Sequence, residues 1–199
     1  IAYLGILPCP TRVDFDWSTF AARLPLRTGE VMTDQMEDLG MRFRAFNALP
    51  DLPDKAILFD TADPTGDDGD LVTPGYGFGN LYPQERVLVI AENDIDLNGD
   101  GLVDEPDDAE LGGVLQVEFT TDRWLGSAKV LDIDVNEFSW IALYDAHDTM
   151  IWMLPLEPLG DNSFQVVPID VMGVRRFELH LGGSGALTGL EFCPEVLVP

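Results

Sequence analysis

The chain carries little positive charge. Only 11 of its 199 residues are lysine or arginine, against 36 aspartates and glutamates, which gives a formal net charge of −25 at pH 7. Phosphate backbones bind to clustered basic side chains, so this balance excludes a nucleic-acid partner and opposes binding to anionic membranes. Such an acidic surface is compatible with bound calcium, with cationic partners or with high salt.

Long hydrophobic runs are missing as well. The apolar start of the chain, residues 1–8, is far shorter than the roughly 20 residues that cross a bilayer, so we expect no membrane insertion. The chain begins with Ile1 rather than methionine. That start predicts a mature product from which a signal peptide has been removed, and therefore an extracellular or cell-surface location.

Cysteine is scarce, since Cys9 and Cys193 are the only two and lie near opposite ends of the chain. They allow one pairing, which closes almost the whole chain into a loop. A chain-entropy estimate gives such a bond about 5 kcal/mol of stabilisation at most. The bond implies an oxidising compartment outside the cytoplasm, whereas two buried free thiols are the alternative.

The sequence also lacks a recognisable catalytic motif. His147 and His180 adjoin no serine or cysteine in a nucleophile motif. P-loop and Rossmann glycine motifs are absent, and the Gly-x-Gly-x-Gly spacing at residues 75–79 has no strand-to-helix context. Because no carboxylate pair stands out among the 36 acids, we expect a protein without enzymatic activity.

What is present favours a folded β protein. The chain is 46% hydrophobic with 19 glycines and 14 prolines, unlike a disordered acidic tail. Short apolar or alternating segments recur about every ten residues between polar, glycine-rich turns. We expect strands at residues 12–17, 40–46, 56–59, 86–91, 113–119, 128–134, 138–144, 150–154, 163–167, 174–181 and 186–192.

This pattern predicts an all-β fold, a jelly-roll-like antiparallel β-sandwich with long calcium-binding loops. No internal repeat, linker or domain boundary is visible, so we expect one β-sandwich domain over residues 1–199. Residues 1–11 are predicted to form an N-terminal strand that either packs on its own fold or is exchanged with a neighbouring molecule. A short helix or turn is expected at residues 33–39.

The densest acidic stretch is residues 92–108, which hold eight carboxylates and two asparagines. One register has the ligand spacing of a twelve-residue EF-hand loop, with Gly101 at the sharp turn and the apolar Val103 at position 8. A calcium ion would neutralise the repulsion within such a run. The predicted ligands are Asp96, Asn98, Asp100, the carbonyl of Leu102, Asp104 and Asp107.

A second register runs from Asp94 to Glu105 and provides the glutamate that EF-hands prefer at position 12. We prefer the first register because only it has an apolar residue at position 8. No amphipathic helix flanks the stretch, so we predict an EF-hand-like loop between two strands. The alternative is a solvated acidic loop without an ion.

A second acidic loop spans residues 60–70 and also contains two glycines and a proline. The number of oxygens suits calcium, but the spacing matches no fixed motif, so ion binding and plain solvation both stay open. The candidate ligands in this loop are Asp60, Asp63, Asp67, Asp68 and Asp70.

Residues 73–83 form a loop rich in glycine and aromatic side chains. Its Tyr76, Phe78 and Tyr82 either stack on sugar rings or pack as a cover over one sheet. The aromatic rings of Trp124 and Trp152 are further candidates for a sugar platform, although they lie elsewhere in the sequence.

The order of these segments resembles a β-sandwich module found in exported bacterial cell-surface proteins. It has a Val-Asp-Phe-Asp opening, an acidic Phe-Asp-Thr-Ala-Asp-Pro-Thr-Gly-Asp loop, a Val-Leu-Asp-Ile-Asp strand and a closing Leu-Gly-Gly-Ser-Gly-Ala-Leu-Thr-Gly-Leu-Glu-Phe segment. The Asp-x-Asn-x-Asp-Gly core resembles the calcium loops of dockerins. The resemblance covers residues 13–192 and implies a calcium-containing, non-catalytic extracellular module. The apolar leader and both cysteines lie outside it.

Two functions fit these features, and both use Ca²⁺ as the cofactor. The preferred one is a secreted calcium-binding structural protein that self-assembles into an extracellular filament, tube or surface layer. In this homo-oligomer or polymer, residues 1–7 or 196–198 add as a strand to a neighbour's sheet. The alternative is a non-catalytic carbohydrate-binding or adhesion module that is stabilised by calcium and binds a polysaccharide.

Overall fold

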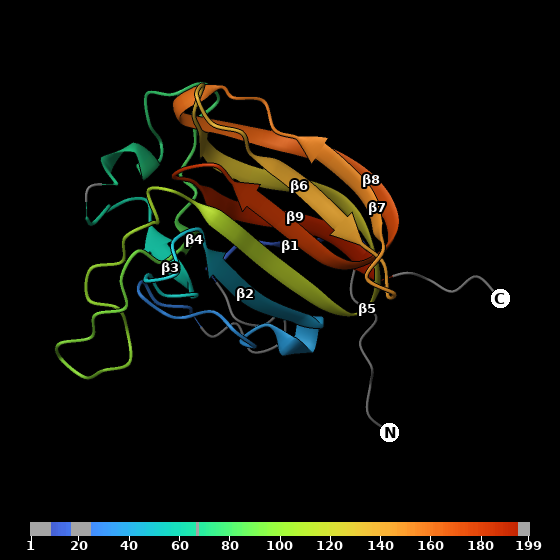
Figure 1. The fold of residues 1–199 in the computed structure, drawn as a ribbon, viewed down its shortest axis with the longest axis horizontal. Helices are drawn as coiled ribbons and strands as arrows, with labels where there is room; N and C mark the ends of the chain where they lie inside the picture. Colours follow the sequence, from blue (N-terminus) through green and yellow to red (C-terminus); the bar gives the residue numbers. More distant parts are fainter. Residues whose placement is uncertain (1–8, 17–24, 67, 195–199) are drawn as a thin grey trace.

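The structure of the protein is a computed structural model that describes residues 9–16, 25–66 and 68–194 (Figure 1). The regular structure in this part of the chain is nine strands and two single-turn 3-10 helices, so the predicted all-β class is confirmed. No helix within it is long and apolar enough to cross a membrane. The elements are β1 (Thr11–Val13), η1 (Glu37–Leu39), β2 (Met41–Asn47), β3 (Ala56–Asp60), η2 (Gly69–Leu71), β4 (Arg86–Ile90), β5 (Gly113–Ile133), β6 (Trp140–Tyr144), β7 (Met150–Pro155), β8 (Gly160–Leu181) and β9 (Ala186–Pro194).

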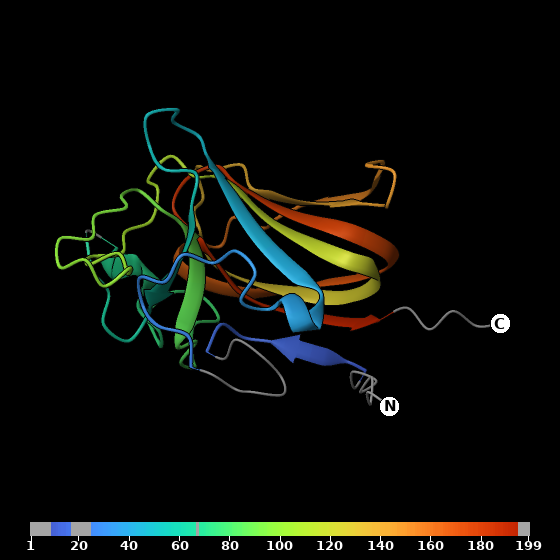
Figure 2. The same cartoon turned by 90° about the horizontal axis from the view of Figure 1, so that it is seen from below.

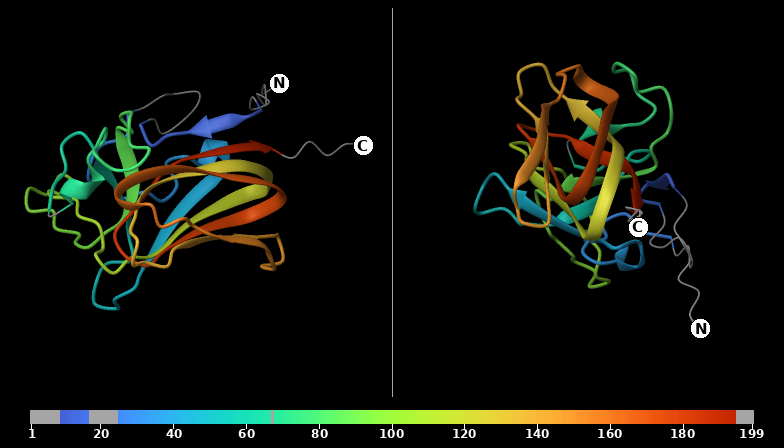
Figure 3. Two further views of the ribbon diagram at one scale, coloured as in Figure 1. Left: turned by 90° about the horizontal axis from the view of Figure 1, so that it is seen from above. Right: turned by 90° about the vertical axis from the view of Figure 1, so that its right-hand side faces the viewer.

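Two long strands, β5 and β8, organise the sandwich. They have 21 and 22 residues and pair with each other antiparallel over most of their length. The ladder shifts register between Glu118 and Ser127, and Gly173 on the β8 side has a φ of 77°. The paired strands bend there and run through both layers (Figure 3). Sequence analysis predicted two strands in place of each, because bulges interrupt the apolar alternation.

The two halves of the ladder belong to different layers, which face each other in Figure 2. In the first layer, residues 113–119 of β5 pair with β2 and with residues 176–181 of β8, and β8 continues to β6 and β7. In the second, residues 123–133 of β5 pair with β9 and with residues 160–174 of β8. Strand β9 also pairs with β1 and β4, and β4 pairs with β3. Every one of these pairings is antiparallel, as the sandwich prediction required.

The main hydrophobic core lies between the layers. Alternation along β2 turns Met41, Phe43 and Ala45 inward, while Arg42 and Arg44 stay exposed. Full burial of a large apolar side chain stabilises the fold by roughly 1.5–3 kcal/mol. This core is therefore the main source of stability for the sandwich.

A smaller hydrophobic cluster covers the outer side of the second layer. Alternate residues of β3 and β4, such as Phe59 and Val87, point into it. Two apolar residues from the acidic loops, Leu71 and Val103, pack over them. Each acidic loop is thereby held against the sandwich by hydrophobic contact.

Two short segments differ from expectation. The strand expected over residues 12–17 spans only Thr11–Val13, because the Asp14 carboxylate accepts a hydrogen bond from the Asp16 N–H and starts a turn. The helix or turn expected at residues 33–39 is the single 3-10 turn η1.

A disulfide joins Cys9 to Cys193, as the preferred pairing predicted, so the free-thiol alternative is wrong. It ties the chain just before β1 to the end of β9, where Thr11 pairs with Phe192. Of the segments predicted to add as strands to a neighbour, residues 1–7 and 196–198 lie outside the described residues, while Thr11, at the end of the predicted strand over residues 1–11, pairs with Phe192 of its own chain.

Replacing both cysteines, Cys9→Ser with Cys193→Ser, should lower the free energy of unfolding by about 2–5 kcal/mol, because the unfolded chain regains the entropy that the bond removes. Urea denaturation followed by tryptophan fluorescence measures the loss. As the control, a reductant should lower the midpoint of the unmodified protein equally and leave the variant unchanged. Equal midpoints for variant and unmodified protein would show that the bond adds no stability.

Candidate functional site

Long loops gather at one end of the sandwich. They follow β3, β4 and β5, and together with the turn between β8 and β9 they form the left-hand end of the molecule in Figure 1. Hydrogen bonds join them: the Asp108 carboxylate accepts from Ser184 and Gly185, and the Asp108 backbone N–H donates to the Asp68 carboxylate. Because segments far apart in sequence meet here, this end is the candidate site.

The aromatic loop, residues 73–83, exposes its three large rings. Tyr76, Phe78 and Tyr82 are 72%, 69% and 73% exposed. The rings therefore do not pack as a cover over a sheet. The Tyr76 hydroxyl donates a hydrogen bond of 2.7 Å to the Asp161 carboxylate, and this bond raises the pKa of Tyr76 to about 12.

Two buried asparagines hold the aromatic loop in place. The side-chain amide of Asn80 donates to the side-chain oxygen of Asn162 over 2.9 Å, and that oxygen also accepts from the Gly77 N–H at 3.0 Å. The Phe164 N–H donates to the carbonyl of Phe78 at 2.7 Å. A Cβ on Gly77 would lie 2.2 Å from the backbone of Asn162. Close packing thus explains a glycine at this point of the Gly-x-Gly-x-Gly stretch.

A groove of about 560 Å³ borders the aromatic loop at Phe78. Its other wall runs from the end of β7 to the first part of β8. Leu154 and Val166 expose apolar surface there, while Glu157 and Gln165 provide polar groups. Sequence analysis missed this wall, because its residues come together only through the turn between the two strands.

The two tryptophans considered as further sugar platforms are engaged elsewhere. Trp152 is half-buried in β7 and packs against the main core. Trp124 lies opposite Cys193 in the β5–β9 ladder and donates its indole N–H to Asp170 over 2.7 Å.

The EF-hand-like loop turns its acidic side chains toward its own backbone. The Asp96 carboxylate accepts hydrogen bonds from the N–H groups of Gly99 at 2.7 Å and Gly101 at 2.9 Å. The Asp104 carboxylate accepts from the Leu97 N–H at 2.7 Å. Backbone donors therefore occupy oxygens that the sequence assigned to calcium.

The residues that distinguish the two registers of this loop lie in different surroundings. Val103 at position 8 of the preferred register is buried. The last ligand of the preferred register, Asp107, lies against Gly66 of the second acidic loop, where a Cβ on the glycine would be 2.2 Å from Oδ1 of Asp107. In the other register, Asp94 forms an ion pair with Lys55 at 2.6 Å, and this hydrogen-bonded pair lowers the pKa of Asp94.

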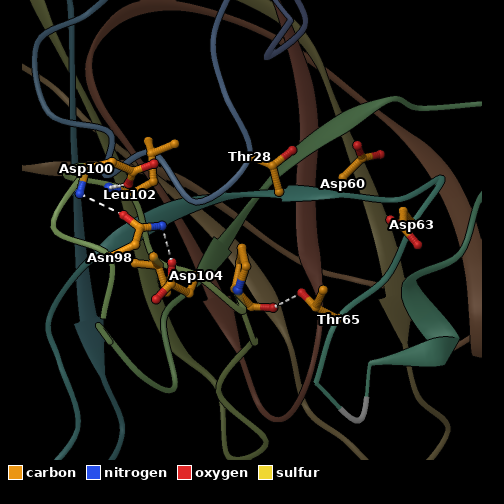
Figure 4. A pocket seen from close by; sticks show the side chains of 10 residues that line it. Thr28, Asp60, Asp63, Thr65, Asn98, Asp100, Leu102 and Asp104 are labelled. Atoms are coloured by element: carbon orange, nitrogen blue, oxygen red, sulfur yellow. Dashed lines mark hydrogen bonds between the residues drawn. The ribbon is translucent and has the colours of Figure 1, made fainter. Parts of the chain in front are cut away.

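The two acidic loops, which the sequence analysis treated separately, face one pocket of about 350 Å³ (Figure 4). Glu105 is exposed and does not line it, and Asp67 lies outside the described residues. Across the described ranges, no three His, Cys, Asp or Glu side chains are grouped so that they could hold a metal ion. The lining includes Asp60, Asp63, Thr65, Asn98, Asp100, Leu102 and Asp104.

Three aspartates at this end of the molecule are buried. Asp68, Asp108 and Asp132 are 8%, 3% and 2% exposed. Among the residues that the structure describes, none of the three forms an ion pair with a lysine, arginine or histidine. The Asp68 carboxylate instead accepts the Asp108 N–H at 2.7 Å.

Burial changes the protonation of these carboxyl groups. It raises the pKa of Asp68 to about 10, and the nearby Asp108 and Asp107 carboxylates add to the shift. Burial also raises the pKa of Asp132 to about 7, although the Asn162 N–H that donates to it acts in the opposite direction. A carboxyl group in such surroundings either keeps a proton near neutral pH or needs a cation beside it.

Sequence analysis named Asp68 as a site residue but missed Asp108 and Asp132. A signal existed for Asp132, since it is an acid between the apolar residues Leu131 and Ile133. Asp108 looked like one more acid at the end of a solvated run. Only the folded chain brings it to Ser184, 76 residues away.

No protein-family model matches the chain, and no curated protein matches it in sequence. Among solved structures, it is similar to the lectin domain of lectinolysin complexed with Lewis B antigen, with 12% identity and a TM-score of 0.33 over 44% of this chain and 68% of that one. It is also similar to a Streptococcus pneumoniae fucose-binding module, with 17% identity and a TM-score of 0.33 over 44% and 67% of the two chains.

In calcium-free buffer with a chelator, the protein should become more stable as the pH falls from about 7 to about 4. The pKa of Asp132 is about 7 in the folded state, raised by burial and by the facing carboxylates of Asp70 and Asp134. In the unfolded chain its pKa is about 4, so the folded state binds the additional proton over this range. At about 1.4 kcal/mol for each pKa unit, the gain is a few kcal/mol.

Thermal melts across this pH range measure the effect. Asp132→Asn keeps an oxygen that accepts from Asn162 and should make the profile shallower, while Asp68, whose pKa burial also raises, keeps contributing to the remaining slope. The control is Asp51→Asn at an exposed site, which should keep the profile of the unmodified protein. A profile that Asp132→Asn leaves unchanged would exclude this carboxyl group as the source.

Proposed function

We propose that the chain is a non-catalytic carbohydrate-binding module of an extracellular protein and that the aromatic loop is its binding face. The observation that carries this proposal is the exposure of three aromatic rings, Tyr76, Phe78 and Tyr82, in one short loop. Large exposed apolar groups that gather in one place mark binding sites. The faces of aromatic rings are apolar and electron-rich, which suits the C–H groups of a sugar ring.

The support under the loop favours tight binding. Asn80 and Asn162 are 1% and 0% exposed, and their hydrogen bonds hold the loop before any ligand arrives. A loop that is already ordered loses little conformational entropy on binding. The groove beside Phe78 is mainly apolar and includes the polar side chains of Glu157 and Gln165, so it offers contacts to both the C–H and the hydroxyl groups of a sugar.

The net charge of the chain restricts the glycans that it can bind. The net charge of −25 repels uronic acids, sulfated sugars and phosphate-bearing polymers, so we expect neutral glycans. The Cys9–Cys193 disulfide supports the extracellular setting, because such bonds persist in oxidising compartments.

Phe78→Ala should weaken binding to neutral glycans by about tenfold, because it removes one ring face worth about 1.4 kcal/mol. A glycan array identifies the ligand, and isothermal titration calorimetry then measures the affinity. The matched control is Phe138→Ala, which removes an equally large ring that is 65% exposed in a different loop. Binding to no neutral glycan would overturn the proposal, and equal losses in both variants would overturn the assignment to this loop.

A second candidate function, self-assembly, is favoured by strand β7. It ends the sheet order, so its outer edge is unpaired in the described chain. Met150, Ile151, Met153 and Leu154 along it are 51%, 39%, 52% and 36% exposed. An apolar edge strand of this kind accepts an added strand from another molecule, here a terminal segment of a second copy. Calcium between the acidic subunits would offset their repulsion.

Electron microscopy of the protein in millimolar calcium, and again after chelation, tests this second candidate. We expect filaments or tubes that need calcium, and Met153→Lys should prevent them by placing a charge on the edge. The control is Met172→Lys, at a residue that is 71% exposed in β8 away from the edge strand. Dispersed monomers in both conditions would overturn self-assembly without affecting the glycan proposal.

A further inference from the structure

We propose that Asp68 and Asp108, here called the carboxylate pair, hold one calcium ion inside the loop end of the sandwich, at a site distinct from the EF-hand-like loop. The pair joins two segments, since Asp68 directly precedes η2 and Asp108 forms an isolated β-bridge with Ala91. The Asp68 carboxylate lies within hydrogen-bonding reach of the Asp108 side chain.

One oxygen of the pair has no hydrogen-bond donor. Oδ2 of Asp108 accepts from Ser184 Oγ at 2.8 Å and from the Gly185 N–H at 2.7 Å. Oδ1 of the same carboxylate has no donor among the described residues. It is also buried, since Asp108 is only 3% exposed. An unpaired polar atom in this position destabilises the fold, and more so when it is charged. A cation at Oδ1 would remove that destabilisation.

The surroundings of the pair add negative charge. Asp70 Oδ1 and Glu137 Oε2 are also buried without a donor in the described chain. Both residues interact electrostatically with Asp108. A single proton shared by the pair leaves the negative charges of Asp70 and Glu137 uncompensated. A divalent cation bound at the pair attracts these two carboxylates as well.

The chemistry of the donors selects the ion. The side-chain groups that meet at this point are the carboxylates of the pair and the Ser184 hydroxyl, all oxygens, and no histidine or cysteine interacts with the pair in the described part of the chain. Hard oxygen donors favour calcium or magnesium over zinc and copper. Calcium accepts irregular sets of six to eight oxygens that include carbonyls and water, so two carboxylates with neutral oxygens suit it better than magnesium.

The site lies next to the support of the aromatic loop. Helix η2 follows Asp68, and the side-chain amide of Asn162 donates to the carbonyls of Asp70 and Val72 just behind it. Asn162 in turn binds Gly77 of the aromatic loop. An ion that holds Asp68 in place therefore also holds the contacts that run from η2 through Asn162 to the aromatic loop. The consequence for glycan binding rests on the proposed function.

Calcium titration of chelator-treated protein tests the inference, with calorimetry for affinity and mass spectrometry for the number of bound ions. Asp108→Asn still accepts from Ser184 and Gly185, so it should fold, yet it should bind one calcium ion fewer and lose the calcium-dependent rise in melting temperature. Affinity at this site should fall by at least about 100-fold. Asp68→Asn is the second variant and should give the same result.

The matched control is Asp96→Asn in the EF-hand-like loop, which should leave the ion at the carboxylate pair in place. Loss of the only bound ion in Asp96→Asn, with normal binding in Asp108→Asn, would overturn the assignment. No calcium binding by the unmodified protein, or equal binding of magnesium, would also overturn it. Calcium bound at the pair without any glycan binding would leave this inference standing and remove the proposed function.

Discussion

The bent ladder of β5 and β8 is the constraint on which the rest of the structure depends. Each strand passes through both layers, so the same pair of strands, with its register shifts at the bend, joins the two layers of the sandwich. The same pairing sets the end of β5 beside the start of β8, where the Asn162 N–H donates to Asp132 at 2.6 Å. Asn162 then holds the aromatic loop. A bend at the end of the molecule opposite the loops thus determines what the loop end displays (Figure 2).

Charge divides the molecule into two environments. Most of its acidic side chains lie in water, where solvent screens them and their repulsion costs little. Asp68, Asp108 and Asp132 are buried in the loop end, where an uncompensated charge is expensive. The hydrophobic contacts of Leu71 and Val103 keep the acidic loops in place despite that cost. Burial of this kind is what makes the loop end a site rather than a solvated surface.

Local sequence patterns predicted the structure correctly where contacts between near neighbours determine it. Alternation predicted β2 and β4 almost to the residue, and the cysteine count predicted the disulfide. The apolar residue expected at position 8 of an EF-hand loop is Val103, which is buried. The same patterns failed at the bend, where bulges split β5 into two predicted strands.

The sequence by itself therefore determined the all-β class, the covalent link between the ends of the chain and the sign of its surface. Tertiary structure decided which oxygens are buried, which rings are exposed and which loops share a pocket. The physical reason is range: periodicity and spacing report contacts between near neighbours, whereas the contact of Asp108 with Ser184 joins residues 76 positions apart. Such contacts exist only after the two layers have packed, because packing alone brings those segments together.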